Sequence, residues 1–381
     1  MKKIVIIGAG EFQVPLIKKA KDMGYETHVF AWREGAVGAE ISDYFYPISI
    51  VDKEEILEIC RKIRPSSIVS IGSDLAVITV NYLLRALGMP ANPVGVDFAA
   101  TNKYMMRQSF AENCISVPRY TVVDEKKDLT RIEGFTFPII VKPTDRSGSR
   151  GIRKVNTKEE LGSAIDAAIE ESFEKRAIVE EYIKGQEYSC ETISFEGQHY
   201  ILAFTKKFTT GAPDFIETAH QQPSDIEENL KIKASKEIIK GLDSLQIQYG
   251  ASHCEFKIDE FGEVKIIEIG ARMGGDCIGS HLVEESEGYD YLKMVIDVAE
   301  GKKPEIIRTH EPRYAFIKFI FEEEDYKTLL RIQTEKPELI CEISKIEKIG
   351  SRKIIDSSSR FGFYILTADT KEELQKFISI I

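Results

Sequence analysis

The sequence predicts an α/β, doubly wound N-terminal domain followed by an α+β region. Over the first 95 residues, short apolar strands alternate with helices that have one polar face. Beyond residue 102, strands follow one another with fewer helices between them, which favours antiparallel pairing. The two patterns of predicted strands and helices therefore indicate at least two domains, as expected for a chain of 381 residues.

The first part of the chain reads as three strand–helix pairs. The predicted strands are KIVII, ETHVFAW and SSIVSIG, and the predicted helices are 14–23, 53–63 and 77–87. Such alternation predicts a parallel sheet with helices on both faces. The segment GMPANPVG then interrupts the pattern with two prolines and two glycines, so we place the end of the first domain at residue 95.

The second part begins with a predicted helix at 103–113, the strand FPIIVKP and the glycine-rich loop DRSGSRG. Further helices are predicted at 157–171 and 230–242, and further strands at RAIVEEYI, EYSCETISF, QHYILAFTKKFT, ASHCEFKID and VKIIEIG. The segment 213–223, which has a proline at each end, reads as an irregular loop. We expect a domain at 96–308, with a central subdomain at about 115–185.

The last part of the chain, 309–381, predicts a small α+β cap. Its strands are RYAFIKFIF and FGFYILTA, and a helix at 371–380 closes the chain. We find no internal repeat.

Composition narrows the classes of function. The net charge of −11 and the lack of a basic tract argue against binding to nucleic acid or to an anionic membrane. The six cysteines form no CxxC pair, so neither a zinc site nor a disulfide framework is indicated. The N-terminal apolar run is far too short for a signal peptide, and we expect a cytoplasmic protein. A homodimer is left open.

Two glutamates are predicted to face each other on one hairpin. If residues 260–263 form its loop, Glu255 lies opposite Glu268 on the same face of the sheet. Opposed carboxylates are destabilising unless a cation lies between them, and two carboxylates suit Mg²⁺. The alternative is that one glutamate faces solvent. Arg272 follows on the loop GARMGGD, where its guanidinium could bind a phosphate or carboxylate next to the metal, or could simply be solvated.

Two further stretches could contact a nucleotide. In VKPTDRSGSRG, Lys142 ends a strand, and the small residues after it can bring backbone N–H groups close to phosphate oxygens. This is not a Walker P-loop, because GxxxxGK[ST] is absent, and an ordinary turn is the alternative. In VEEYIKGQEYS, a linker between two sheets could take an adenine through its backbone and a ribose through a carboxylate.

Taken in order, these motifs resemble the ATP-grasp superfamily over roughly residues 1–300, and the 309–381 segment is compatible with its usual cap. The resemblance implies two ATP-grasp subdomains, ATP and Mg²⁺ (or Mn²⁺) as cofactors, and small-molecule substrates. It implies a Mg²⁺ site at Glu255 and Glu268. The implied nucleotide-binding residues are Lys103, Lys142, Ser147, Gly148, Ser149, Gly151, Glu180, Glu181, Ile183 and Glu187. Many members have Glu-x-Asn at the last metal motif, whereas this chain has Gly270 at the Asn position, which leaves a third protein ligand open.

A narrower resemblance is to the L-amino acid (dipeptide) ligase branch, carried by PDFIETAHQQP and GARMGGD. It implies that Glu217, His220, Arg272 and Gly275 line the substrate pocket, with catalytic roles for Arg272, Lys142 and His220. For His220, the alternative is an ordinary loop histidine whose hydrogen bonds are satisfied.

The loop GAGEF at 8–12 suggests a dinucleotide site, but Gln13 replaces the third glycine of GxGxxG. We expect this loop to line the substrate cleft instead. Asp74, at the end of a predicted strand, faces the same cleft if the sheet is parallel, or else caps a helix.

The sequence thus predicts an ATP-dependent carboxylate–amine ligase that works through an acyl phosphate, with an amino acid substrate. The alternatives are an ATP-grasp ligase acting on another carboxylate or a carbamoyl-phosphate-type donor, and a nucleotide-binding module without turnover.

Overall fold

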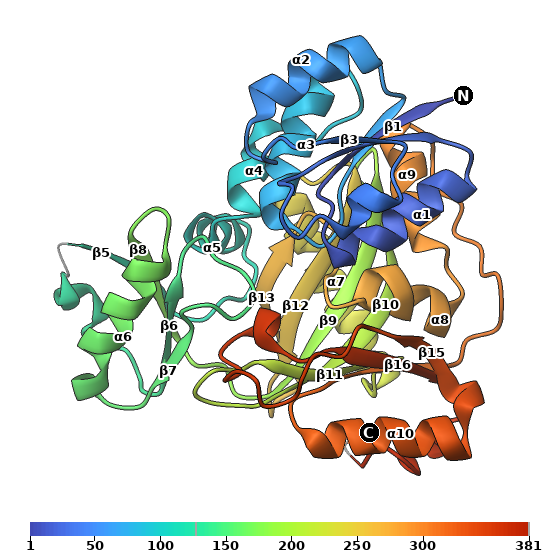
Figure 1. The fold of residues 1–381 in the computed structure, drawn as a ribbon. Helices are drawn as coiled ribbons and strands as arrows, with labels where there is room; N and C mark the ends of the chain where they lie inside the picture. Colours follow the sequence, from blue (N-terminus) through green and yellow to red (C-terminus); the bar gives the residue numbers. More distant parts are fainter. Residues whose placement is uncertain (126–127, 380–381) are drawn as a thin grey trace.

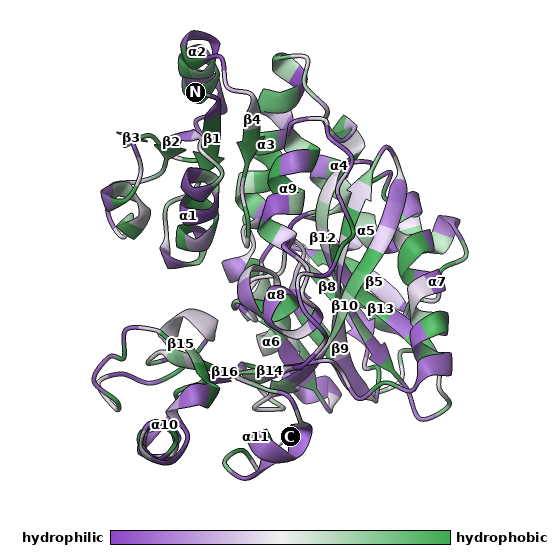
Figure 2. Ribbon diagram, turned by 90° about the vertical axis from the view of Figure 1, so that its right-hand side faces the viewer, coloured by the Kyte–Doolittle hydropathy of each residue, from purple (hydrophilic) through white to green (hydrophobic). Residues whose placement is uncertain are grey.

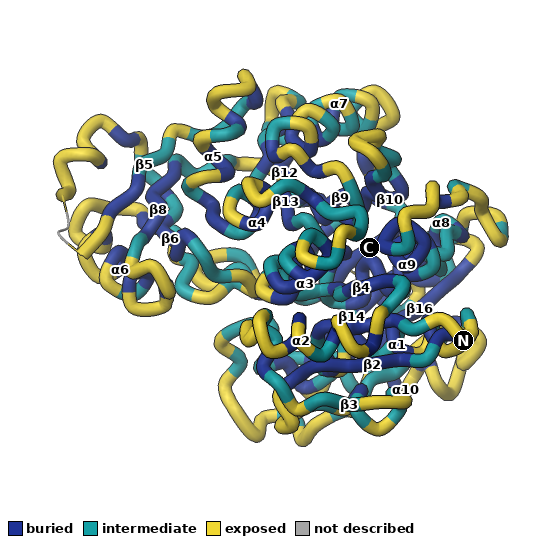
Figure 3. Tube along the Cα trace, turned by 90° about the horizontal axis from the view of Figure 1, so that it is seen from above, coloured by how far each residue is buried: buried dark blue, intermediate teal, exposed yellow. Residues whose placement is uncertain are grey.

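The computed structural model describes residues 1–125 and 128–379 and contains three β-sheets. Figure 1 shows a blue N-terminal part, a green part standing to one side, and a long sheet that runs through the middle of the molecule. In the burial view, the strands of the sheets are mostly buried and the connecting loops are largely exposed (Figure 3).

The N-terminal sheet is parallel throughout, in the order β3-β2-β1-β4. Its strands are β1 (Lys3–Ile7), β2 (Glu26–Phe30), β3 (Tyr44–Tyr46) and β4 (Ser67–Val69). The helices that follow are α1 (Val14–Asp22), α2 (Lys53–Ile63), α3 (Asp74–Ala86) and α4 (Val94–Ala99).

Alternation along β1 explains why helices cover both faces of this sheet. Ile4 and Ile6 pack in one apolar cluster with α1, while Val5 and Ile7 pack in another with α2 and α3. The hydropathy view shows β1 and α3 as largely apolar (Figure 2). The doubly wound arrangement expected from the strand–helix alternation is therefore present.

A second, antiparallel sheet has the order β5-β8-β6-β7. Its strands are β5 (Tyr120–Asp124), β6 (Ile139–Pro143), β7 (Arg153–Val155) and β8 (Arg176–Glu181). Helix α6 (Lys158–Glu171) covers one face, and α5 (Lys103–Glu112) precedes the sheet in the chain. This is the part that stands apart in Figure 1.

The third sheet has eight strands in the order β13-β12-β9-β10-β11-β14-β16-β15. They are β9 (Gln186–Phe195), β10 (Gln198–Thr209), β11 (Glu217–Gln222), β12 (Gly250–Ile258), β13 (Val264–Gly270), β14 (Tyr314–Phe319), β15 (Ile340–Ile343) and β16 (Phe363–Ala368). Its helices are α7 (Glu228–Ser244), α8 (Val283–Glu287), α9 (Tyr291–Ala299), α10 (Glu323–Glu335) and α11 (Lys371–Gln375). The strands of the expected C-terminal cap continue this sheet, because β14 pairs with β11.

Three local expectations need correction. The segment predicted as an irregular loop contains β11, whose residues pair with β10 on one side and β14 on the other. The helix predicted from residue 77 begins at Asp74, and its N-cap is Ser73, whose hydroxyl accepts a hydrogen bond from Ala76 N–H at 3.3 Å. The last helix ends at Gln375 rather than at residue 380, which lies outside the described residues.

A β-bulge sets the register of the β12–β13 hairpin. Ile258 pairs with Val264, so the loop is one residue longer than expected, and this register alone would place Glu255 opposite Ile267. A register shift next to Phe256 compensates, and Glu255 pairs with Glu268 after all. The predicted pairing is thus present, although it arises from a longer loop and a bulge.

Candidate active site

One cavity of about 160 Å³ gathers most of the predicted site residues between the antiparallel sheet and the eight-stranded sheet. Its lining includes Lys103, Lys142, Ser147, Gly148, Ser149, Glu180, Glu181, Ile183, Glu187, Glu217, Glu255, Glu268 and Arg272. These residues come from segments that are far apart in the sequence. We call this cavity the active cleft.

A buried ion network forms the wall of the cleft on the side of the antiparallel sheet. The Lys142 ammonium lies 2.6 Å from the Glu180 carboxylate, and Arg107 Nε donates to the same carboxylate at 2.5 Å. Burial raises the pKa of Glu180, but Arg107 and Lys142 outweigh burial and hold that pKa at about 2. Burial lowers the pKa of Lys142 despite the attraction of Glu180. Glu180 therefore acts as an anion that places the Lys142 ammonium.

Arg107 was not anticipated from the sequence. It is fully buried, and its Nη2 also donates to the carbonyl of Ile267, the bulged residue of the hairpin, at 2.6 Å. The Arg107 side chain thus links α5 to the antiparallel sheet through Glu180 and to the eight-stranded sheet through Ile267. The available signal was its position one helical turn after Lys103, which puts both cations on one face of α5.

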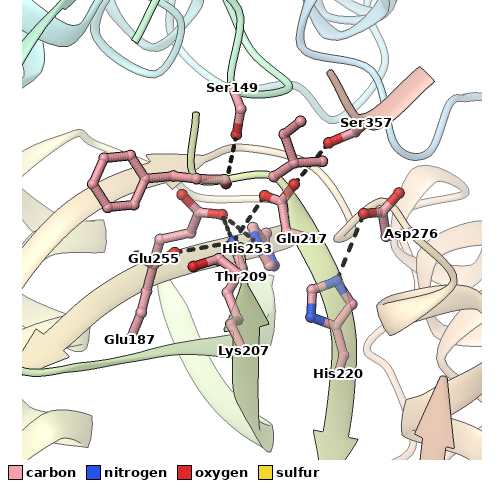
Figure 4. A network of polar contacts seen from close by, with 12 residues as sticks. Ser149, Glu187, Lys207, Thr209, Glu217, His220, His253, Glu255, Asp276 and Ser357 are labelled. Carbon is pink, nitrogen blue, oxygen red and sulfur yellow. Dashed lines mark hydrogen bonds and ion pairs between the residues drawn. The ribbon is translucent and has the colours of Figure 1, made fainter. Parts of the chain in front are cut away.

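The two hairpin glutamates both face the cleft, and each contacts a lysine. Lys103 Nζ donates to Glu268 at 2.9 Å, and Lys207 on β10 forms an ion pair with Glu255. Lys207 also lies 3.3 Å from Glu187 and 3.6 Å from Glu217. Figure 4 shows this buried lysine among the three carboxylates. Burial lowers the pKa of Lys207, but Glu255, Glu187 and Glu217 together raise it well above its usual value.

A buried histidine lies next to Glu255. His253 Nδ1 contacts Glu191, a fully buried carboxylate, and His253 Nε2 lies 3.4 Å from Glu255. Burial lowers the pKa of His253, but Glu191 raises it to about 9. The other oxygen of Glu191 accepts the backbone N–H of Gly274 at 2.9 Å. Glu191 therefore fixes both the imidazole and the GARMGGD loop.

The donor set around the hairpin fits a divalent cation. Glu255 and Glu268 are cross-strand partners that line the same cleft, and each lies beside a lysine. Within residues 1–125 and 128–379, no group of three or more His, Cys, Asp or Glu side chains is placed to hold a metal. Two carboxylates suit Mg²⁺, which usually completes its coordination with water and phosphate oxygens.

Arg272 and Asp74 join the eight-stranded sheet to the N-terminal sheet. Arg272 Nε donates to Asp74 Oδ1 at 2.8 Å, and Nη2 donates to Oδ2 at 3.2 Å. Burial raises the pKa of Asp74, but Arg272 lowers it below its usual value. Asp74 lines a larger, adjoining cavity of about 1020 Å³, which shares Lys103, Glu268 and part of the 145–151 loop with the active cleft.

Besides Asp74, three predicted site residues lie outside the lining of the active cleft. Gly151 lines a separate small cavity, and Gly275 lies beside Gly72. His220 is 1 % exposed, its ring packs edge-on against Phe319, and its Nε2 lies 3.6 Å from Asp276. His220 is the cross-strand partner of Lys207, so it lies on the same face of the sheet as the cleft, but beside the cleft lining rather than in it. Its predicted substrate contact stays a prediction.

A C-terminal segment, 356–360, contacts residues of the site and was not anticipated. Ser357 Oγ donates to Glu217 at 2.7 Å, and Arg360 donates to both oxygens of Asp276 at 2.9 and 2.6 Å. Figure 4 shows Ser357 above Glu217 and His220 pointing at Asp276. Sequence spacing gave no signal for these contacts, since about 140 residues separate Ser357 from Glu217.

Comparison with known proteins identifies the class. The ATP-grasp domain family matches residues 135–280. This segment is similar to the ATP-grasp domains of ATP-dependent ligases, and ATP-grasp ligases use ATP with Mg²⁺. Within the residues the structure describes, no helix is long and apolar enough to span a membrane.

Two curated proteins and one solved structure are examples of the proteins to which the chain is similar. D-alanine–D-alanine ligase B of Chromobacterium violaceum is 28% identical over 232 residues, covering 58% of this chain and 75% of that protein. Alanine–anticapsin ligase of Bacillus subtilis is 24% identical over 314 residues, covering 72% of this chain and 66% of that protein. The L-amino acid ligase structure from Bacillus licheniformis has the same fold, with a TM-score of 0.81, 20% identity, and coverage of 99% and 96% of the two chains.

Proposed function

We propose that this protein is an ATP-dependent carboxylate–amine ligase that joins an amino acid to an amine through an acyl phosphate. The observation that carries the proposal is the active cleft, which lines up phosphate-binding cations, two carboxylates suited to Mg²⁺ and Arg272. The named amino acid ligases among the relatives support the choice of substrate class.

In this proposal, one carboxylate oxygen of the first substrate attacks the γ-phosphorus of ATP. ADP leaves, and the product is an acyl phosphate. The amine nitrogen then attacks the acyl carbon, loses a proton, and phosphate leaves with the bridging oxygen. Phosphoryl transfer of this kind depends mainly on positioning and charge neutralisation. This accounts for a site rich in fixed charges that needs no nucleophile from the protein.

Each part of the cleft has a role in that chemistry. Lys103, Lys142 and the 145–151 loop are the phosphate-binding elements. Glu181, Ile183 and Glu187 line the cleft where β8 leads into β9, and in this proposal they take the adenine and ribose. Glu180 orients Lys142 rather than contacting the base.

The hairpin carboxylates Glu255 and Glu268 would hold Mg²⁺, which would neutralise phosphate charge during transfer. When ATP and metal bind, the Lys103 and Lys207 ammoniums would become available to the phosphates instead of to these carboxylates. In this proposal Arg272 takes the carboxylate of the amino acid that is phosphorylated, and Glu217 takes the ammonium of the second, amine substrate.

A matrix of paired amino acids, assayed for ADP and phosphate release with mass analysis of products, tests this proposal. We expect stoichiometric ADP, phosphate and amide product for at least one pair. ATP turnover that proceeds only with carboxylates lacking an amino group would contradict the amino acid assignment. Nucleotide binding without turnover for any carboxylate would contradict the ligase assignment.

A further inference from the structure

A second cavity, of about 70 Å³, lies between the N-terminal sheet and the eight-stranded sheet. Strand β4 and helix α3 form one wall, and β12 and α9 form the other. Its apolar lining consists of Ile68, Val69, Val77, Val80, Leu84, Ala251, Ala271, Val295, Val298 and Ala299, among others. Several alanines keep the space open.

Arg272 is the one charged side chain among the described residues that line this cavity, and it also lines the active cleft. The two asparagines in the lining are already engaged. Asn81 donates to Asp97 at 3.0 Å, and Asn92 bonds the backbone of Tyr249 in both directions. The lining is therefore mainly apolar, and Arg272 is the residue that it shares with the active cleft.

The same face of β12 runs through both cavities. Side chains alternate along a strand, so Ala251, His253 and Glu255 share a face. His253 and Glu255 line the active cleft, and Ala251 lines the apolar cavity. The apolar cavity thus continues the floor of the active cleft beyond the reacting groups.

We propose that this cavity holds the aliphatic side chain of the amino acid whose carboxylate is phosphorylated, an inference that rests on the proposed ligase function. The substrate carboxylate then lies on Arg272 and its ammonium on Asp74. Arg272 and Asp74 form an ion pair, so the positive Arg272 can bind the carboxylate of a zwitterion and the negative Asp74 can bind its ammonium. A charged or amide side chain would be left without partners in this lining.

The volume of the apolar cavity limits which aliphatic side chains fit into it. An apolar cavity of about 150 Å³ accommodates a benzene ring, so about 70 Å³ suits a branched chain of three or four carbons. Valine and leucine fit this description, whereas tryptophan is too large and glycine leaves the cavity empty. A missing methylene in an apolar pocket costs on the order of tenfold or more in kcat/KM.

The test compares kcat/KM for glycine, alanine, valine, leucine and tryptophan as the phosphorylated substrate in the wild type and two variants. Ala251→Val fills the cavity, and Val295→Ala enlarges it. We expect the wild type to prefer valine or leucine over glycine by on the order of a hundredfold. The filled variant should shift its preference toward alanine, and the enlarged one toward larger side chains, each by about tenfold.

Opposite shifts in the two variants cannot arise from a general loss of stability, and the Kd for an ATP analogue should stay within a few-fold in both. Turnover with amino acids that is equal for all side chains, or that shifts in the same direction in both variants, would overturn this inference but leave the ligase assignment in place. The absence of turnover with any amino acid would overturn both.

Discussion

Glu255 on β12 lies directly opposite Glu268 on β13, because a bulge next to Phe256 offsets a hairpin loop one residue longer than expected. Arg107 holds the bulged carbonyl of Ile267 from the neighbouring helix. The backbone of the hairpin therefore sets the pairing of the two carboxylates. This geometry is the basis of the first prediction.

Glu268→Gln should lower ligase turnover by at least about a hundredfold while changing the free energy of unfolding little. The variant loses one of the two charges available to Mg²⁺, but an amide of the same shape can still accept the Lys103 hydrogen bond. Steady-state ADP release at several Mg²⁺ concentrations measures the effect. Glu263→Gln, in the exposed loop of the same hairpin, is the control and should keep wild-type turnover. Equal activity of the two variants would exclude Glu268 as a metal ligand.

Arg107→Met should destabilise the protein by about 3–5 kcal/mol, because it removes one cation from the buried Glu180 carboxylate. It should also weaken the binding of ATP analogue, since Lys142 and the hairpin lose a common support. Urea unfolding and calorimetric binding measure the two effects. Gln108→Met, at the next and exposed position of α5, controls for the methionine itself. Unchanged nucleotide affinity in a folded Arg107→Met protein would argue against this link.

The Glu180 ion network should make stability fall in acid. The pKa of Glu180 is about 2 in the folded protein, below the ordinary value of 4.5. Its contribution is therefore fully present above about pH 4.5 and is lost as the pH falls toward 2. A depression of this size corresponds to about 3 kcal/mol. The stability gap between wild type and Glu180→Gln should narrow between pH 5 and pH 3, measured by urea unfolding. Glu133→Gln, at an exposed site, should show no such narrowing.

The 145–151 loop should become protected when nucleotide binds. The Asp145 carboxylate accepts backbone N–H groups of Phe173 and Glu174 at 3.2 and 2.8 Å, which anchors the start of the loop. The tip of the loop makes two contacts outside the antiparallel sheet. Ser149 donates a hydrogen bond to the Phe215 carbonyl at 3.2 Å, and Arg150 lies 3.9 Å from the Asp356 carboxylate. Hydrogen exchange at 146–150 should slow on adding an ATP analogue with Mg²⁺. Identical exchange in both states would mean that the loop does not cover the phosphates.

Glu217→Ala should reduce kcat/KM for the amino substrate by about 30-fold or more while leaving the Kd for ATP within a few-fold. Losing one partner of a buried, charge-assisted contact costs on the order of 2–5 kcal/mol. Ser357→Ala, which removes only the hydroxyl that supports Glu217, should show a smaller loss of the same kind. A collapse of ATP affinity in Glu217→Ala would instead place this carboxylate in the nucleotide site.

The sequence indicated the residues whose chemistry is carried by local motifs. Lys142 ends a strand before a glycine-rich loop, and Glu268 and Arg272 lie on one hairpin and its turn, so short-range spacing was enough to select them as candidate site residues. All three line the active cleft. The supporting residues were missed because their partners are distant in sequence. Lys207 and Glu255 are 48 residues apart, and Glu191 and His253 are 62 apart.

His220 shows what residue spacing alone could not settle. Its spacing from Glu217 suggested a shared pocket, and a register shift in the β10–β11 pairing places both residues on the face of the sheet that carries Lys207. Glu217 lines the cleft, whereas His220 is buried on the same face against Phe319. The prolines at 213 and 223 suggested a loop, yet they flank β11 without interrupting it, so the strand's ladder is preserved. The directions of the Glu217 and His220 side chains could be deduced only once this segment was known to be a strand.

The most direct test of the ligase mechanism follows the fate of oxygen. An amino acid labelled with ¹⁸O in its carboxylate is incubated with ATP, Mg²⁺ and the amine substrate, and the released phosphate is analysed by mass spectrometry. An acyl phosphate intermediate transfers one carboxylate oxygen to each phosphate, so the account predicts one ¹⁸O atom per phosphate alongside ADP. Unlabelled phosphate, or the formation of AMP and pyrophosphate, would contradict it.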